Sequence, residues 1–194
     1  MQERHAALRA VWAETGKWPE KVLHMRTRIG INTGQAVIGN MGSEMRFNYT
    51  MMGDSVNLAA RCESGAKTYG VYIMITEDTL RAAVQYDDSL NYRQLDRIVV
   101  QGRSQPVNIY ELWDGTVAPD LIDACKAAYE AALEDYFQGR WEAALDGFET
   151  CLEREPARAY ARTTPSKVMA ARCREFLQHG APEPWDGVYR MTSK

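Results

Sequence analysis

The chain has 194 residues, of which 45% are hydrophobic, and a formal net charge of -3 at pH 7. This composition suits a globular protein with one domain of ordinary size, or a small domain with an appendage. Without a basic excess to release counterions, the chain is not expected to bind nucleic acid. No apolar run is long enough to span a bilayer and no secretory signal begins the sequence, so no membrane segment is expected in these residues.

The cysteines are widely spaced and form no C-x-x-C pair; they are Cys62, Cys125, Cys151 and Cys173. This spacing fits neither a metal site nor a disulfide framework. We therefore expect reduced packing residues in a cytoplasmic protein. The three histidines are isolated from one another and are expected to be surface or packing residues, so the sequence suggests no metal site of its own.

The first elements in chain order are a helix and two strands. Residues 3–18 have amphipathic spacing, which predicts a helix that Gly16 and Pro19 close. Alternating residues predict a strand over 26–32 and a second strand over 35–40. Because Thr33-Gly34 suits a turn, these two strands are expected to form a hairpin, and Met41 to Ser43 a loop after it.

The next stretch, RFNYTMMGDSVNLAAR from Arg46 to Arg61, combines a polar, aromatic approach with a helix of small residues. Asp54 is expected to be the N-cap of that helix. Asn57 and Arg61 are four residues apart and therefore lie on one face, about one turn apart. An amide and a guanidinium that point the same way suit a site where negative charge develops on phosphate. An ordinary solvated helix face is the alternative.

Further strands are expected at 71–76, 95–100 and 107–112, with a short helix over 77–84 that Thr76 caps. Strands and helices alternate and at least one strand pair is antiparallel, which indicates the α+β class. The composition changes at Asp114, so the chain is expected to divide into a domain over residues 1–113, a linker over 114–120 and a helical extension over 121–194.

Within the extension, residues 121–153 resemble a helical hairpin of tetratricopeptide type, with Gly139 between its helices. A third helix is expected to begin at Pro165, capped by Thr164, and the aromatic residues of the last segment to pack back on the helices. A single repeat cannot bury its own apolar face, and peptide-binding grooves usually need several repeats. The extension is therefore expected to cover the first domain, with a binding groove as the alternative.

The run IGINTGQAVIGNMGSEMRFNYTMMGDSVNLAARCES resembles the catalytic domain of class III nucleotide cyclases, and RIVVQGRSQPVNIYEL extends the resemblance over most of residues 26–113. The resemblance implies a partial ferredoxin-like cyclase domain of an adenylate cyclase, which forms cyclic AMP and pyrophosphate from ATP in intracellular signal transduction. The C-terminal part is similar to the tail of bacterial adenylate cyclases that carry an extracytoplasmic sensor and membrane helices. A membrane-anchored parent protein is therefore compatible with the sequence.

The resemblance also implies roles for individual residues. Asn57 would orient the ribose of ATP, and Arg61 would stabilise charge on the α-phosphate. Thr50 falls where the family reads the purine, and a threonine there is associated with adenine; a plain strand residue is the alternative. The family often has a lysine for the triphosphate where Gln101 stands here, and Arg103 could reach the same phosphates or be a solvated loop cation.

The strand and loop that carry the family's two metal-binding aspartates match nothing in residues 1–25. Family enzymes build the active site across a dimer interface, where one subunit gives the metals and the other gives Asn and Arg. The resemblance therefore implies a homodimer, with Mg²⁺ or Mn²⁺ held by carboxylates upstream of this chain or on a partner subunit, and a chain that is inactive alone. A catalytically inactive half-cyclase that acts as a regulatory or dimerisation module, and a guanylate cyclase, remain the alternatives.

Overall fold

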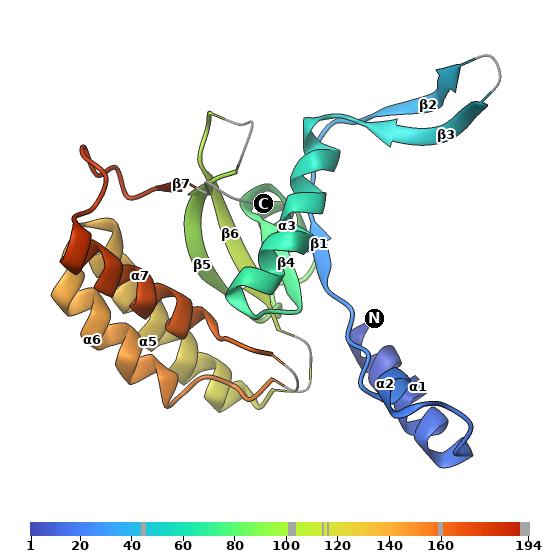
Figure 1. Cartoon of the computed structure of the whole chain (residues 1–194), viewed down its shortest axis with the longest axis horizontal. Helices are drawn as coiled ribbons and strands as arrows, with labels where there is room; N and C mark the ends of the chain where they lie inside the picture. The colour runs from blue at the N-terminus through green and yellow to red at the C-terminus, as the bar shows by residue number, and fades with distance from the viewer. Residues whose placement is uncertain (44–45, 101–103, 114, 116, 159–160, 191–194) are drawn as a thin grey trace.

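The computed structural model describes residues 1–43, 46–100, 104–113, 115, 117–158 and 161–190. A five-stranded mixed sheet lies between a group of helices on one side and a separate two-stranded hairpin on the other (Figure 1). The expected α+β class is confirmed. Among the described residues, no helix combines the length and apolarity that a bilayer crossing requires.

The sheet has the order β1-β4-β6-β5-β7. Strand β1 (Ile29–Ile31) is parallel to β4 (Ile73–Thr76), and β4 is antiparallel to β6 (Val107–Leu112). Strand β6 is antiparallel to β5 (Tyr92–Val99), which is parallel to the short β7 (Tyr189–Arg190). The sheet therefore joins strands from both ends of the chain.

The two-stranded sheet pairs β2 (Val37–Ser43) with β3 (Arg46–Met52), with Gly39 opposite Thr50. The predicted hairpin of residues 26–32 with 35–40 is therefore wrong, and so is the loop predicted over Met41 to Ser43, which belongs to β2. The reason is tertiary, because β1 is held in the main sheet beside β4. The following segment leaves that sheet and pairs with β3 instead.

Helix α3 (Asp54–Tyr69) packs on β1 with its backbone almost in contact with the strand. A Cβ atom added at Gly30 would lie 2.2 Å from the Glu63 nitrogen and 2.4 Å from the Ala59 carbonyl oxygen. Only glycine leaves room for this approach. The N-cap is Gly53 rather than the predicted Asp54, since the Gly53 carbonyl accepts from the first helical N–H groups; Asp54 lies in the first turn, where the helix dipole favours a carboxylate.

The remaining helices of the first domain are short or peripheral. Helix α1 (Gln2–Thr15) is capped by Gly16, so it ends earlier than the helix predicted over residues 3–18. It is followed by the single turn α2 (Glu20–Leu23). Helix α4 (Glu77–Ala83) starts after Thr76, which occupies the predicted N-cap position. Its side chain makes no capping hydrogen bond, because the hydroxyl donates to Asn32 instead.

Helices α5 (Pro119–Phe137), α6 (Trp141–Leu152) and α7 (Pro165–His179) pack beside β5 (Figure 1). Helix α7 begins as predicted, with Thr164 Oγ1 accepting a hydrogen bond from the Lys167 backbone. Trp185 packs back on the helices as predicted, and its Nε1 donates to the Phe137 carbonyl over 3.1 Å. Side chains of α5–α7, α3 and the sheet form one continuous buried cluster, so the helices and the sheet share a core.

All four cysteines are free and buried, which confirms their prediction as packing residues. Burial raises the pKa of the Cys62 thiol to about 11 and that of the Cys173 thiol to about 12. Thiols with such values carry little thiolate at neutral pH and are poor nucleophiles.

A buried ionic network joins the sheet to the helices. Arg93 on β5 donates through Nε to Glu111 on β6 over 3.0 Å, and through Nη2 to Glu155 over 2.9 Å. Glu155 also accepts from the Ser166 hydroxyl at the start of α7, and Arg158 pairs with both carboxylates. Burial alone would raise the pKa of Glu155, but the Arg93 guanidinium holds it below its usual range. Glu155 is therefore an ionised anchor between α6, α7 and the sheet.

Gly30→Ala should destabilise the protein by about 2–3 kcal/mol, because the new methyl group would overlap the α3 backbone, which cannot move without opening the core. Urea unfolding followed by circular dichroism measures this. Gly39→Ala is the matched control, since a Cβ there meets no atom within 4 Å; its effect should stay within about 0.5 kcal/mol. Equal effects for the two variants would contradict the packing described here.

Glu155→Gln should cost about 2–4 kcal/mol, because it removes one of the two carboxylates that compensate the buried Arg93. Glu149→Gln, which breaks an exposed pair with Arg174, should cost no more than about 1 kcal/mol. The folded-state pKa of Glu155 is depressed, so its stabilisation is present above the unfolded value near 4.5 and is lost as the pH falls through the folded value. The Gln variant should therefore lose less stability than the parent chain below pH 4.5, and parallel pH curves would argue against the network.

Candidate functional site

Helix α3 presents Asn57 and Arg61 on the side away from its packed face. Asn57 is exposed and Arg61, one turn further, is half-buried, whereas Leu58 and Cys62 lie in the core. Within the described part of the chain, neither Asn57 nor Arg61 has a side-chain hydrogen bond or ion pair. The structure thus brings together an amide and an uncompensated guanidinium that can meet an anionic ligand.

The first turn of α3 is fixed by Asn32, which follows β1. Asn32 Nδ2 donates to the Ser55 carbonyl over 3.0 Å, and its Oδ1 accepts from the Thr76 hydroxyl over 2.8 Å. One side chain therefore connects the ends of β1 and β4 with the start of the helix that carries Asn57. From the sequence, Asn32 is predicted only as the last residue of a strand. The signal that could have identified Asn32 is an amide side chain at the carboxyl end of a strand, where side chains of neighbouring strands converge.

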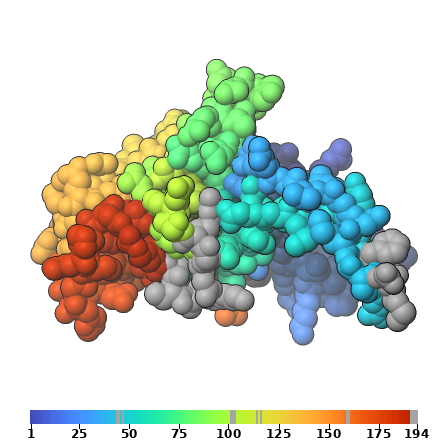
Figure 2. Space-filling view, turned by 90° about the horizontal axis from the view of Figure 1, so that it is seen from above, coloured from blue at the N-terminus to red at the C-terminus, as the bar shows by residue number. Residues whose placement is uncertain are grey.

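Thr50 lies on the hairpin and not on α3. It is exposed on β3. Figure 2 shows the hairpin and the helices α5–α7 at opposite ends of the molecule. In the described residues, no hydrogen bond connects Thr50 with Asn57 or Arg61, although Gly53 is the corner between their two elements. The structure thus places Asn57 and Arg61 on one helix and Thr50 on the hairpin before it.

Gln101 and Arg103 lie outside the described residues. Strand β5 ends at Val99, directly before them, and there it pairs with Arg190 of β7. Their predicted roles therefore stay predictions.

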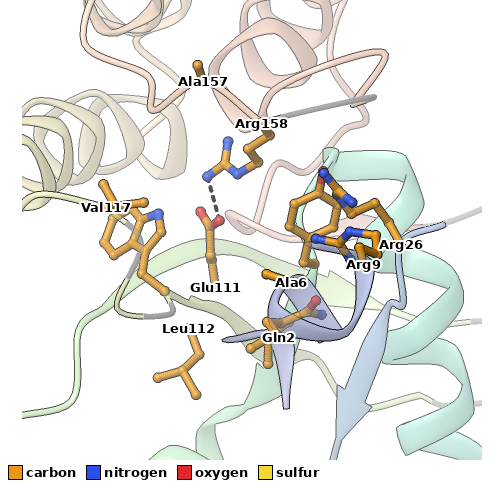
Figure 3. Close-up of a pocket in the computed structure, with 12 residues that line it drawn as sticks. Gln2, Ala6, Arg9, Arg26, Glu111, Leu112, Val117, Ala157 and Arg158 are labelled. Carbon is orange, nitrogen blue, oxygen red and sulfur yellow. Dashed lines mark hydrogen bonds and ion pairs between the residues drawn. The ribbon is translucent and has the colours of Figure 1, made fainter. Parts of the chain in front are cut away.

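A pocket of about 230 Å³ lies elsewhere, between α1, the ends of β4 and β6, and the segment after α6 (Figure 3). Glu111 and Arg158 line it as an ion pair, and Gln2 and Arg9 lie on its other side. It is smaller than the roughly 300–1,000 Å³ of typical ligand sites. None of Thr50, Asn57 and Arg61 lines it, so this pocket is not the predicted site.

The described residues do not fit a divalent metal site. No group of three or more His, Cys, Asp or Glu side chains among them lies close enough together to hold an ion. Mg²⁺ takes oxygen ligands in near-octahedral geometry and is usually bound through carboxylates.

Comparisons with known proteins agree with the resemblance. The family described as "Adenylate and Guanylate cyclase catalytic domain" matches residues 6–113. The chain is 35% identical over 151 residues, or 77% of its length, to "Adenylate cyclase, terminal-differentiation specific" from Dictyostelium discoideum, of which it covers 7%. It is 38% identical over 103 residues, or 53% of its length, to "Adenylate cyclase 1" from Rhizobium meliloti, of which it covers 15%.

Among solved structures, the adenylyl cyclase CyaB from P. aeruginosa is similar with a TM-score of 0.46 and 32% identity, over 59% of this chain and 54% of that one. The chain thus spans a small part of the curated relatives it matches. The 151 matched residues exceed the 113 that precede the predicted linker, so the similarity to the Dictyostelium protein reaches into the helices beyond it.

Proposed function

The chain belongs to the adenylate and guanylate cyclase catalytic domain family, and we propose that it supplies one half of an active site that converts ATP to 3′,5′-cyclic AMP and pyrophosphate. The observation that carries this proposal is the pair of Asn57 and Arg61, one turn apart on the outer face of α3, with no partner within the described residues. The relatives with the names given above are adenylate cyclases, which favours ATP over GTP.

In the proposed reaction, the 3′-oxygen of the ribose attacks the α-phosphorus, the new O–P bond forms, and the bond to the departing pyrophosphate breaks. Negative charge then concentrates on oxygens around the α-phosphorus. Arg61 stabilises that charge, because a guanidinium can donate two parallel hydrogen bonds to phosphate oxygens. Asn57 holds the ribose so that the 3′-oxygen is in line for attack.

Thr50 and Arg103 complete the proposed contacts to the nucleotide. The Thr50 hydroxyl oxygen accepts a hydrogen bond from the N6 amino group of adenine, which guanine lacks at that position. Its exposure on β3 leaves it available for such a contact. Arg103 contributes positive charge to the triphosphate in place of the lysine that the family often has where Gln101 stands.

Divalent Mg²⁺ or Mn²⁺, when bound, would neutralise the triphosphate and activate the attacking oxygen. Because the described residues offer no carboxylate cluster, we place its ligands on a partner subunit or on a further segment of the protein. This division makes the 194-residue chain inactive alone. ATP as substrate and four free thiols both suit the cytoplasm.

The hairpin supports the proposal of a dimer. Five large apolar side chains on β2 and β3 are between 54% and 76% exposed: Val37, Ile38, Tyr49, Met51 and Met52. A two-stranded hairpin is marginally stable in water, and exposed apolar patches of this kind mark interaction sites. The strand pairing places Ile38, Tyr49 and Met51 on one face of the hairpin, and Val37 and Met52 on the other. We propose that the face with Ile38, Tyr49 and Met51, here called the hairpin patch, packs against a second cyclase domain.

The domain division proposed for the chain remains residues 1–113, a linker over 114–120, and a tetratricopeptide-like extension over 121–194. It is supported by the change from strands to helices after β6. The alternative function is a catalytically inactive half-cyclase that dimerises and regulates a partner. It would use the same hairpin patch and would differ in having no chemical role for Arg61.

The proposal that this chain supplies half of an active site is tested by using it to restore activity to a second, inactivated cyclase. An adenylate cyclase of the family is first inactivated by replacing the residues that match Asn57 and Arg61 with alanine. It should form cyclic AMP from ATP and Mg²⁺ again when this chain is added. Arg61→Ala in the chain should lower the restored kcat by about 100-fold or more, the usual loss for a donor that stabilises transition-state charge. Arg81→Ala is the control, because Arg81 is an exposed residue of α4 that pairs with Glu77.

Cyclic AMP is measured by chromatography, and the complex of the two chains by sedimentation. A complex that forms without restored turnover would favour the regulatory module. Substantial turnover by this chain alone would show that it holds the complete site.

Ile38→Lys and Tyr49→Lys should weaken self-association by at least about 10-fold, because each places a charge in the apolar hairpin patch. Sedimentation velocity over a concentration series measures the change. Leu177→Lys is the matched control, since Leu177 is an exposed apolar residue of α7, far along the chain from the hairpin. If all three variants associate like the parent chain, the dimer does not use the hairpin.

A further inference from the structure

Arg172 lies in the middle of the packed face of α7 and is buried among three polar partners, Asp96, Tyr69 and Tyr136. The Tyr136 hydroxyl accepts from Arg172 Nη1 over 3.2 Å. Arg172 Nη1 also donates to Asp96 Oδ2 on β5, and Arg172 Nη2 donates to the Tyr69 hydroxyl over 3.3 Å. The Tyr69 hydroxyl in turn donates to Asp96 Oδ2 over 2.6 Å. The exposed fractions are 6% for Arg172, 0% for Asp96 and 1% for Tyr69. The three side chains form a closed, buried triangle that joins α7, β5 and α3.

The charges in this triangle depend on one another. Burial acts to lower the pKa of Arg172, but Tyr69 and Asp96 together raise it well above its usual value. Burial also raises the pKa of Tyr69, so its hydroxyl keeps the proton that it donates. Buried ionic groups are often no more stabilising than apolar residues of the same volume. What such a network does provide is a defined geometry, since each member is held by directional bonds.

Tyr69 is the last residue of α3, and Arg61 precedes it by eight residues on the same helix. At 1.5 Å per residue this is about 12 Å along one helix, so the position of Tyr69 bears directly on that of Arg61. The next residue, Gly70, ends the helix with φ 71°, and a Cβ there would lie 2.1 Å from the Thr163 carbonyl oxygen. The segment that leads into α7 thus presses against the end of α3 beside Tyr69.

Arg172 also faces the strand that leads to the predicted phosphate-binding segment. Its guanidinium carbon lies 3.5 Å from the centre of the Tyr189 ring. Tyr189 belongs to β7, which pairs with Ile98 and Val99 at the end of β5. Arg172 therefore contacts both the helix that carries Arg61 and the strand that pairs with the end of β5.

We propose that Arg172 is a positioning residue of the cyclase site: through Tyr69 and Asp96 it sets the orientation of α3, and with it the position of Arg61 in the transition state. The helical extension is thereby a part of the catalytic apparatus and a place from which the rate can be controlled. This inference rests on the proposed function. Since Arg61 acts on charge that develops during the reaction, a loss of positioning lowers kcat and leaves the KM for ATP nearly unchanged.

The test uses the restored activity described above with Tyr69→Phe, Arg172→Met and the double variant. Tyr69→Phe removes one hydroxyl and keeps the ion pair of Arg172 with Asp96, so the fold is retained, as thermal unfolding verifies. Each single variant should lower kcat by about 10-fold with KM within about twofold, and the double variant should lose no more than Arg172→Met alone. Arg174→Met, which breaks an exposed pair on the same helix, is the control and should leave kcat unchanged.

An unchanged kcat for Tyr69→Phe, a rise in KM at constant kcat, or losses that multiply in the double variant would each overturn the proposal. Amide hydrogen exchange of the chain itself supplies a readout without turnover. Arg172→Met should speed exchange in α3 between residues 57 and 69, and Arg174→Met should not. If the parent chain restores no activity, the proposed function fails, and the exchange data still decide whether Arg172 holds α3. Faster exchange confined to α7 would show that it does not.

Discussion

The direct packing of α3 on β1 is the constraint on which the rest of the structure depends. At Gly30 the strand and helix backbones approach so closely that no side chain fits between them. This contact orients α3 across β1 and β4, which leaves Asn57 and Arg61 on the outer side of the helix. It also holds β1 in the main sheet, so that the following residues form a separate hairpin. The candidate site and the candidate dimer surface therefore follow from one close contact.

The helical extension is fastened to the sheet by polar groups as well as by apolar packing. Arg93 and Glu155 connect β5 with the start of α7, and Arg172 connects the middle of α7 with Asp96 and Tyr69. Between them lies an apolar cluster in which Tyr136 contacts aromatic rings from α6, α7 and the last segment. Because both ionic networks are buried, relative movement of extension and sheet would expose or separate charges at considerable cost. The extension is therefore held firmly against the sheet.

Much of the local structure could be predicted from the sequence. Helix α3 is predicted from its amphipathic pattern and small residues, and the start of α7 from Thr164-Pro165. Both signals depend only on residues that are close together in the chain, and both helices form as expected. The pairing of β1 could not be predicted, because alternation shows that a strand exists and not which strand it meets. Arg172 and Asp96 stand out as charges within apolar patterns, but they are 76 residues apart, and no local rule pairs them.

The family assignment and the geometry of α3 lead to one central claim, that this chain contributes Asn57 and Arg61 to a site whose metal-binding half is on other residues. The most direct test is a continuous-variation experiment, in which the chain and a cyclase lacking its own Asn and Arg are mixed at constant total concentration. If each contributes one half, cyclic AMP formation peaks near equimolar mixing and vanishes at both ends. A rate that rises steadily with the fraction of this chain would contradict the account.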